Sequence, residues 1–156
     1  MKKNQACILL GSNIEPVKHL KEACIHLEKD FSILGKSSIW RTAAIGSDGP
    51  DFLNTAVILE TTHNSTQLKE LLNQIEQKLG RVRVEDKFAP RTIDLDILTF
   101  NGSTLDPNLF LRAFAAVPAS ELIPDMLDPI SKLKLSVVAE QLKARSEIQR
   151  CNECLD

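Results

Sequence analysis

The order of apolar and polar positions along the chain predicts alternating strands and helices. A continuous apolar run at residues 6–10 is typical of a strand buried in a sheet, and Gly11 ends it. Apolar residues at helical spacing follow over residues 16–29, where Pro16 suits a first helical turn. Residues 32–45 are predicted to be extended, with a possible bend at Gly35, and residues 52–61 to form a strand. A helix capped near Asn64 (65–79) and a strand (92–100) follow, and two further helices are predicted near 116–122 and 134–146.

The predicted order strand, helix, strand, strand, helix, strand indicates an α+β fold. That order is typical of the ferredoxin-like βαββαβ arrangement, an antiparallel sheet with helices packed on one face. The two later helices are C-terminal additions to this core. The sequence contains no repeat, linker or low-complexity segment, so residues 1–156 are expected to form a single domain.

Composition narrows the classes of partner. Of 156 residues, 4% are aromatic, with six Phe, one Trp and no Tyr, and the formal net charge is −2. Base-stacking surfaces use many aromatic side chains, and nucleic-acid binders carry a basic surface. We therefore expect no nucleic-acid partner.

No apolar run is long enough for a membrane span or a signal-peptide core, so a cytoplasmic protein without a membrane partner is expected. Cys7 and Cys24 lie at apolar periodic positions that predict burial. Cys151 and Cys154 form a CxxC pair without a second pair, which favours a polar tail. A metal or redox role for this tail would need a second chain.

Two carboxylates, Asp94 and Asp96, stand two residues apart in the predicted strand 92–100. Residues i and i+2 of a strand share a face, so these acids are neighbours, while Ile93, Leu95 and Ile97 fill the other face. Adjacent carboxylates repel unless a cation lies between them, and oxygen ligands favour Mg²⁺. The alternative is an exposed strand face that carries two solvated acids.

A basic segment precedes the carboxylates and carries Arg81, Arg83, Lys87 and Arg91. Guanidinium groups match phosphate oxygens, and a basic segment beside a carboxylate pair suits Mg²⁺-nucleotide chemistry. The alternative is a solvated loop that pairs internally with its own acids. Neither a P-loop nor a dinucleotide-binding glycine motif is present.

Several short strings now point to one family. Leu10-Gly11-Ser12-Asn13, Trp40-Arg41-Thr42, Asp51-Phe52-Leu53-Asn54, Gly80-Arg81-Val82-Arg83 and Pro90-Arg91-Thr92-Ile93-Asp94-Leu95-Asp96-Ile97 occur in that order. Together they resemble the 6-hydroxymethyl-7,8-dihydropterin pyrophosphokinases of folate biosynthesis, over roughly residues 6–125. The resemblance implies pyrophosphoryl transfer from ATP to the pterin hydroxymethyl group with release of AMP. It also implies the ferredoxin-like core.

The resemblance also assigns roles, position by position. It implies two Mg²⁺ ions bound by Asp94 and Asp96, and catalytic roles for Arg81, Arg91, Asp94 and Asp96. Pterin-binding positions are Thr42, Ala43, Ile45, Phe52, Asn54 and Phe114. ATP-binding positions are Glu76, Arg81, Arg83, Lys87, Arg91, Ile97 and Arg112. Gly11 and Asn13 are expected to be structural, and the enzyme is expected to be a monomer.

The chain departs from the family pattern in residues 101–113, which are shorter and lack the histidine usually found there. Arg112 and Phe114 match, whereas Ala43-Ala44, Phe88 and Ala89 replace a proline pair, a tryptophan and a glycine. These differences leave two alternatives: a weakened paralogue that binds a pterin, and another Mg²⁺-dependent phosphotransferase.

Overall fold

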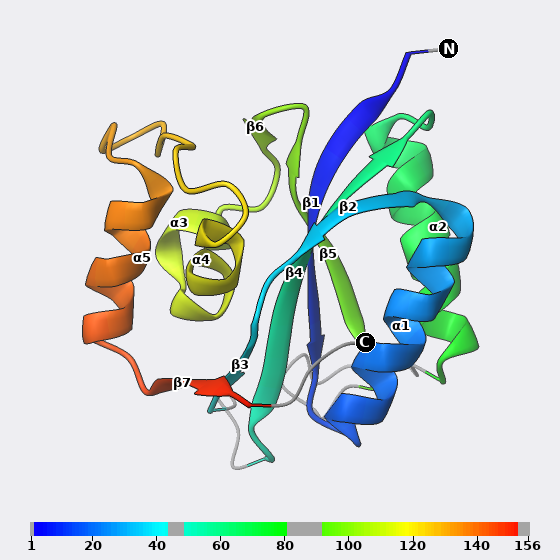
Figure 1. Cartoon of the computed structure of the whole chain (residues 1–156), viewed down its shortest axis with the longest axis horizontal. Coiled ribbons are helices and arrows are strands. Elements are labelled where there is room, and N and C mark those ends of the chain that lie inside the picture. Colours follow the sequence, from blue (N-terminus) through cyan, green and yellow to red (C-terminus); the bar gives the residue numbers. More distant parts are fainter. Residues whose placement is uncertain (1, 44–48, 81–91, 153–156) are drawn as a thin grey trace.

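The computed structural model describes residues 2–43, 49–80 and 92–152 (Figure 1). Its elements run in the predicted order, with additions near the C-terminus. In chain order they are β1 (Asn4–Ser12), α1 (Pro16–Asp30), β2 (Ser32–Lys36), β3 (Ile39–Thr42), β4 (Phe52–Thr61), α2 (Ser65–Lys78), β5 (Asp94–Phe100), β6 (Ser103–Thr104), α3 (Asn108–Leu111), α4 (Ala113–Ser120), α5 (Leu135–Ala144) and β7 (Ile148–Cys151). No helix of the described residues is long and apolar enough to cross a membrane.

The strands form one antiparallel sheet in the order β6-β5-β1-β4-β3-β7, and β2 also pairs with β4. β1 therefore lies between β4 and β5, as the ferredoxin-like order requires, and that prediction is confirmed. The predicted extended stretch 32–45 becomes β2 and β3, which pair with the same edge of β4. Its predicted bend appears as a register shift between Ile33 and Gly35.

Both faces of the sheet are covered by helices (Figure 1). From β1, Ala6, Ile8 and Leu10 belong to the core under α1 and α2, whereas Cys7 and Leu9 belong to the core under α4 and α5. The expectation of helices on one face holds for α1 and α2 only. A strand that is apolar on both sides needs two covers, and the C-terminal helices supply the second.

Local sequence accounts for the ends of the two predicted helices. Pro16 is the first residue of α1. Asn64 caps α2 by accepting a hydrogen bond from the Gln67 backbone N–H (2.8 Å), while the Gln67 side chain accepts one from Asn64 (3.0 Å). These caps satisfy donors that the first helical turn leaves unpaired.

Cys7 and Cys24 are buried free thiols, as the apolar spacing predicted. Burial raises the pKa of Cys7 to about 12 and that of Cys24 to about 11. Such thiols stay protonated at neutral pH and act as small apolar side chains.

The C-terminal segment is more ordered than a polar tail. Residues Ile148–Cys151 form β7, which pairs with β3 from Ile39 to Thr42. The expectation of a tail over Cys151 to Cys154 is therefore wrong for Cys151, because the edge of β3 offers backbone groups with which this residue pairs. Cys154 lies outside the described residues.

Glu121, at the end of α4, joins that helix to β3. One carboxylate oxygen accepts hydrogen bonds from the Ser38 backbone N–H and hydroxyl, both at 3.0 Å. The other accepts from the Trp40 indole Nε1 at 2.7 Å. The Lys143 ammonium of α5 lies 5.0 Å from the Trp40 ring centroid, a cation–π distance. One carboxylate thus fixes the position of α4 over the sheet.

Replacing Glu121 by alanine should lower the free energy of unfolding by about 1–3 kcal/mol, because the Trp40 indole and Ser38 amide lose their acceptor. Urea unfolding followed by tryptophan fluorescence measures this change. Glu140→Ala, an exposed position on α5, is the control and should change stability by less than about 0.5 kcal/mol. Equal effects from the two variants would contradict the role given to Glu121.

Candidate active site

Asp94 and Asp96 lie on the face of β5 that α4 covers. They are the register partners of Gly11 and Leu9, and Leu9 packs in the core under α4 and α5. Their neighbours Ile93, Leu95 and Ile97 pack against the core under α1 and α2. The structure therefore confirms the predicted division of this strand into an acidic face and an apolar face.

The pKa of Asp96 is raised from its ordinary value near 3.8 to about 7. Burial is the largest cause, the negative charges of Asp94, Asp106 and Glu76 act in the same direction, and Lys69 opposes them. A carboxyl group in this setting gains most from a bound cation, because a cation offsets both the desolvation and the repulsion.

Asp106 is an acidic neighbour of Asp96 that the sequence pattern did not reveal. The backbone N–H groups of Leu105 and Asp106 both donate to the Leu98 carbonyl, at 2.9 and 3.3 Å, so the chain after β6 folds back toward β5. The Asp106 carboxylate accepts from the Asn108 N–H at 2.9 Å, at the start of α3. This return of the chain after the β5–β6 hairpin brings Asp106 close enough to act on Asp96.

Glu76 reaches β5 from the other face of the sheet. This side chain of α2 is 3% exposed, and its Oε2 accepts a hydrogen bond from the Leu95 backbone N–H at 2.8 Å. Among the described strands, β6 pairs only with Thr99 and Phe100 of β5. Glu76 therefore supplies the acceptor for a strand N–H that no neighbouring strand occupies, and it holds β5 in place between the two aspartates.

The predicted pterin positions lie on the same face as the aspartates. Asn54 of β4 is the register partner of Gly11, so Asp94, Gly11 and Asn54 form one row across three strands. Asn54 is buried, and its Nδ2 donates to the Thr42 hydroxyl of β3 at 3.1 Å. A buried amide with a donor and an acceptor can bind the amide-like edge of a heterocycle.

Two aromatic side chains lie on the same face of the sheet as this amide. Phe52 is two residues before Asn54 on β4 and therefore shares its face. Phe114 is half-buried near the start of α4 and packs against the core on that face. The face thus combines an amide, two aromatic rings and a carboxylate pair.

The remaining predicted positions fall into three places. Ile97 lies on the α1 and α2 face with Glu76, Arg112 is exposed between α3 and α4, and Ala43 is exposed after β3. Arg81, Arg83, Lys87, Arg91 and Ile45 lie outside the described residues. The structure therefore brings together the carboxylates and the pterin positions Thr42, Phe52 and Asn54 on one face.

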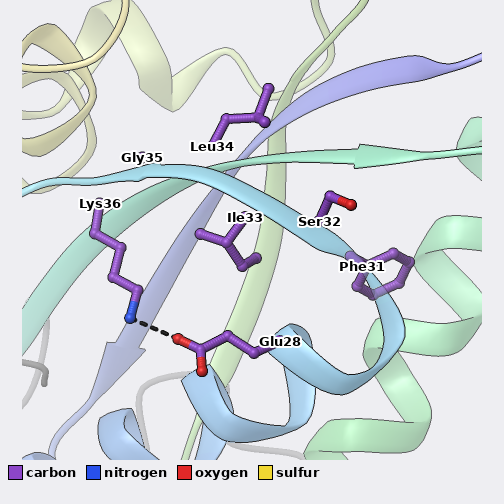
Figure 2. Close-up of a pocket in the computed structure, with 7 residues that line it drawn as sticks. All are labelled: Glu28, Phe31, Ser32, Ile33, Leu34, Gly35 and Lys36. Atoms are coloured by element: carbon purple, nitrogen blue, oxygen red, sulfur yellow. Dashed lines mark hydrogen bonds and ion pairs between the residues drawn. The ribbon is translucent and has the colours of Figure 1, made fainter.

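The hollow shown in Figure 2 is separate from this site. It lies between the end of α1 and β2, where Lys36 Nζ and Glu28 Oε1 form a salt bridge of 2.7 Å. β2 pairs with β4 over residues 57–60, farther along that strand than Asn54. The hollow has no acidic or amide cluster like that of the α4 face.

An α+β sheet with a carboxylate pair and a buried amide on one face suits a small-molecule phosphotransferase. Residues 7–124 match the model of the 7,8-dihydro-6-hydroxymethylpterin-pyrophosphokinase (HPPK) family. The chain belongs to this family.

Relatives named 2-amino-4-hydroxy-6-hydroxymethyldihydropteridine pyrophosphokinase support the assignment. The Synechocystis protein is 34% identical over 148 residues, which cover 88% of this chain and 75% of that one. The Bacillus subtilis protein is 38% identical over 131 residues, covering 76% and 78%. The Methylorubrum extorquens protein is 36% identical, covering 79% and 85%.

Solved structures show the same fold at lower identity. The Plasmodium falciparum HPPK-DHPS structure with pteroate aligns with a TM-score of 0.75 at 14% identity over 92% of this chain. The structure of that protein with pterin and p-hydroxybenzoate aligns with a TM-score of 0.74 at 13% identity. This chain spans 43% and 44% of those longer chains, so the likeness concerns the fold of that part only.

The raised pKa of Asp96 predicts how pH changes the stability of the metal-free protein. Between about pH 4 and 7 the folded carboxyl keeps a proton that the unfolded chain has lost, so its contribution to stability falls as pH rises. Asp96→Asn cannot ionise. In EDTA, the free energy of unfolding of Asp96→Asn relative to that of wild type should therefore increase by on the order of 2 kcal/mol between pH 5 and pH 8.

Urea unfolding at both pH values measures this difference, and Mg²⁺ should reduce it at pH 8 by stabilising the wild-type carboxylate. Asp30→Asn, an exposed position at the end of α1, is the control and should show no such trend. If the difference in free energy of unfolding between wild type and Asp96→Asn stays constant between pH 5 and 8, Asp96 titrates normally.

Proposed function

We propose that the family's reaction runs on the α4 face of the sheet, across β4, β1 and β5. The chain is a pyrophosphokinase that transfers pyrophosphate from ATP to the hydroxymethyl group of 6-hydroxymethyl-7,8-dihydropterin and releases AMP, a step of folate biosynthesis. The observation that carries the placement is the row Asp94, Gly11, Asn54. Adjacent strands lie about 4.8 Å apart, so the two polar positions are separated by roughly 10 Å.

That separation suits the reaction's geometry. A ring held at its amide edge by Asn54 would extend across β1 and present its hydroxymethyl group toward β5. Phe52 and Phe114 would then bind the faces of the ring, since aromatic rings stack in offset geometry. Thr42 orients the Asn54 amide through the 3.1 Å hydrogen bond. Ala43 and Ile45 complete the proposed pterin site.

Asp94 and Asp96 are the proposed ligands of two Mg²⁺ ions. The described residues contain no group of three or more His, Cys, Asp or Glu that could hold a metal. Two carboxylates are still sufficient, because Mg²⁺ often binds one or two carboxylates and completes its shell with substrate phosphates and water. The high pKa of Asp96 supports the proposal, since this carboxyl group is poorly solvated without a cation.

When bound, Mg²⁺ would neutralise phosphate charge and favour deprotonation of the attacking hydroxyl. ATP would lie along β5, with Glu76 and Ile97 on one side of the strand and Arg112 near the start of α4. Arg81, Arg83, Lys87 and Arg91 are the proposed phosphate-binding cations, of which Arg81 and Arg91 act with Asp94 and Asp96 in catalysis. Glu76 supports this site by holding the Leu95 N–H.

Catalysis then consists of positioning and charge compensation, and no protein nucleophile is needed. Asn54 and the aromatic rings hold the pterin, and the carboxylates hold the phosphate end of ATP through its cations. The shortened 101–113 segment still places Arg112 and Phe114 at the start of α4. This favours an active enzyme over a pterin-binding paralogue that has lost catalysis.

Three broader proposals accompany the site. The two cores share one sheet, which supports one domain over residues 1–156. The proposed site residues come from one chain, which supports a monomer. The need for ATP supports a cytoplasmic location.

Asp96→Asn should abolish Mg²⁺-dependent AMP formation, with a loss of at least a hundredfold, because the cation loses a charged ligand. A coupled assay with ATP and 6-hydroxymethyl-7,8-dihydropterin measures AMP. Pterin binding by calorimetry should stay within threefold of wild type, which shows that the variant folds. Asp30→Asn should retain full activity. Retained AMP formation in Asp96→Asn would disprove the metal assignment, and formation of ADP in wild type would indicate a different phosphotransferase.

Asn54→Ala should weaken pterin binding ten- to a hundredfold, because the ring loses a buried hydrogen-bonding partner. Calorimetry with the pterin alone measures this, and affinity for a non-hydrolysable ATP analogue with Mg²⁺ should be unchanged. Thr55→Val is the matched control: it is the next residue on β4, its side chain faces the other way, and it also loses a buried hydrogen bond. Equal pterin affinities of the two variants would place the pterin elsewhere.

A further inference from the structure

The end of β1 touches both halves of the proposed site. β4 and β5 are antiparallel to β1, so their first residues, Phe52 and Asp94, both flank the last residues of β1. This topology places Gly11, Ser12 and Asn13 between the pterin positions and the carboxylates. Gly11 lies against Asn54, and Ser12 and Asn13 each donate to a backbone carbonyl two residues before a site residue.

Ser12 holds the start of β5. The residue is fully buried, and its hydroxyl has one proton to donate. The nearer acceptor is the Thr92 carbonyl at 2.5 Å, and the Ile14 carbonyl lies at 3.2 Å. Thr92 is two residues before Asp94, so this hydrogen bond fixes the backbone from which the carboxylate pair projects.

Gly11 makes room for the Asn54 side chain. A Cβ built on Gly11 would lie 2.9 Å from Asn54 Oδ1, closer than carbon and oxygen approach without displacement. The Asn54 amide cannot move away at no cost, because its Nδ2 donates to Thr42. Glycine at this position therefore lets the pterin-binding amide lie directly over β1.

Asn13 holds the segment before β4. The side chain is 3% exposed, and its Nδ2 donates to the Pro50 carbonyl at 3.4 Å. Pro50 is two residues before Phe52. The arrangement mirrors that of Ser12 and Thr92, since both side chains hold a carbonyl two residues before a site residue.

We infer that Gly11, Ser12 and Asn13 are positioning residues that set the placement of the pterin half of the site relative to the carboxylate half. The inference rests on the proposed function, because it takes Asn54 and Phe52 as pterin ligands and Asp94 and Asp96 as metal ligands. It gives separate tasks to the three residues, of which Gly11 and Asn13 were expected to be only structural: Ser12 acts on the carboxylates, and Gly11 and Asn13 act on the pterin positions.

Ser12→Ala and Gly11→Ala should affect opposite halves. In Ser12→Ala, the calorimetric Kd for a non-hydrolysable ATP analogue with Mg²⁺ should rise five- to twentyfold, and the Mg²⁺ concentration for half-maximal activity should rise with it. The Kd for the pterin alone should stay within twofold of wild type. In Gly11→Ala the pterin Kd should rise at least tenfold, while the Kd for the Mg²⁺ analogue should stay within twofold.

Thr61→Val separates positioning from plain stability. Thr61 is also buried on β4, at the far end of the sheet, and its hydroxyl accepts a hydrogen bond from the His63 N–H at 3.1 Å. This variant should lower Tm without moving either Kd. Ser12→Cys keeps a side chain of similar size with a weaker hydrogen-bond donor. It should therefore show a smaller rise in the Kd for the Mg²⁺ analogue than Ser12→Ala, with the pterin Kd again unchanged. This variant also serves as the test if Ser12→Ala does not fold.

Two results would overturn the inference. The first is that the Ser12 and Gly11 variants lower Tm as Thr61→Val does but leave both Kd values unchanged. The second is that every variant weakens binding of the pterin and of the Mg²⁺ analogue equally, which would indicate a general loss of structure. Asp96→Asn in the same series keeps the two hypotheses apart: if it still makes AMP, the proposed metal site fails, whereas an inactive Asp96→Asn beside unaffected Ser12 variants rejects only the positioning role.

Discussion

Burial of β1 on both faces is the constraint on which the rest of the structure depends. Ala6, Ile8 and Leu10 point to one helical layer, and Cys7 and Leu9 point to the other. Each face needs a cover, because exposed apolar surface costs about 25 cal/mol per Å². The C-terminal helices are therefore part of the core of the fold. The same requirement places α4, which carries Phe114, over the face that holds the aspartates.

The site begins where this burial ends. Leu9 is the last apolar residue of β1 on the α4 face, and Gly11 takes the next position on that face. Polar side chains occupy the flanking strands at that level, with Asn54 on one side and Asp94 on the other. Asp96, one level deeper beside Leu9, is accordingly the carboxyl group with the raised pKa. A position at the edge of the core makes Asp96 costly to charge without a cation and leaves the Asn54 amide buried.

Sequence patterns predicted the parts that depend on local order. The period-2 spacing placed Asp94 and Asp96 on one face, and the element order led to the correct strand arrangement. The roles of Glu121 and strand β7 were not predictable, because each depends on a contact between residues far apart in the chain. The effect of Asp106 on Asp96 depends instead on how the chain folds back after the β5–β6 hairpin. The close approach of Gly11 and Asn54 was hidden because these two residues are also far apart in the chain. A glycine after a strand signals a turn, whereas its role here follows from the register with β4.

The shortened segment 101–113 changes the surroundings of the carboxylates more than those of the pterin positions. Asn101 and Gly102 close a tight hairpin, and the return of Leu105 and Asp106 to the Leu98 carbonyl leads directly into α3. Phe114 still follows at the start of α4, so the aromatic position is kept. Asp106, by contrast, adds negative charge close to Asp96 and helps raise the pKa of that carboxyl group. The segment therefore strengthens the demand for a cation at Asp96, while the proposed pterin positions Asn54, Phe52 and Phe114 lie outside it.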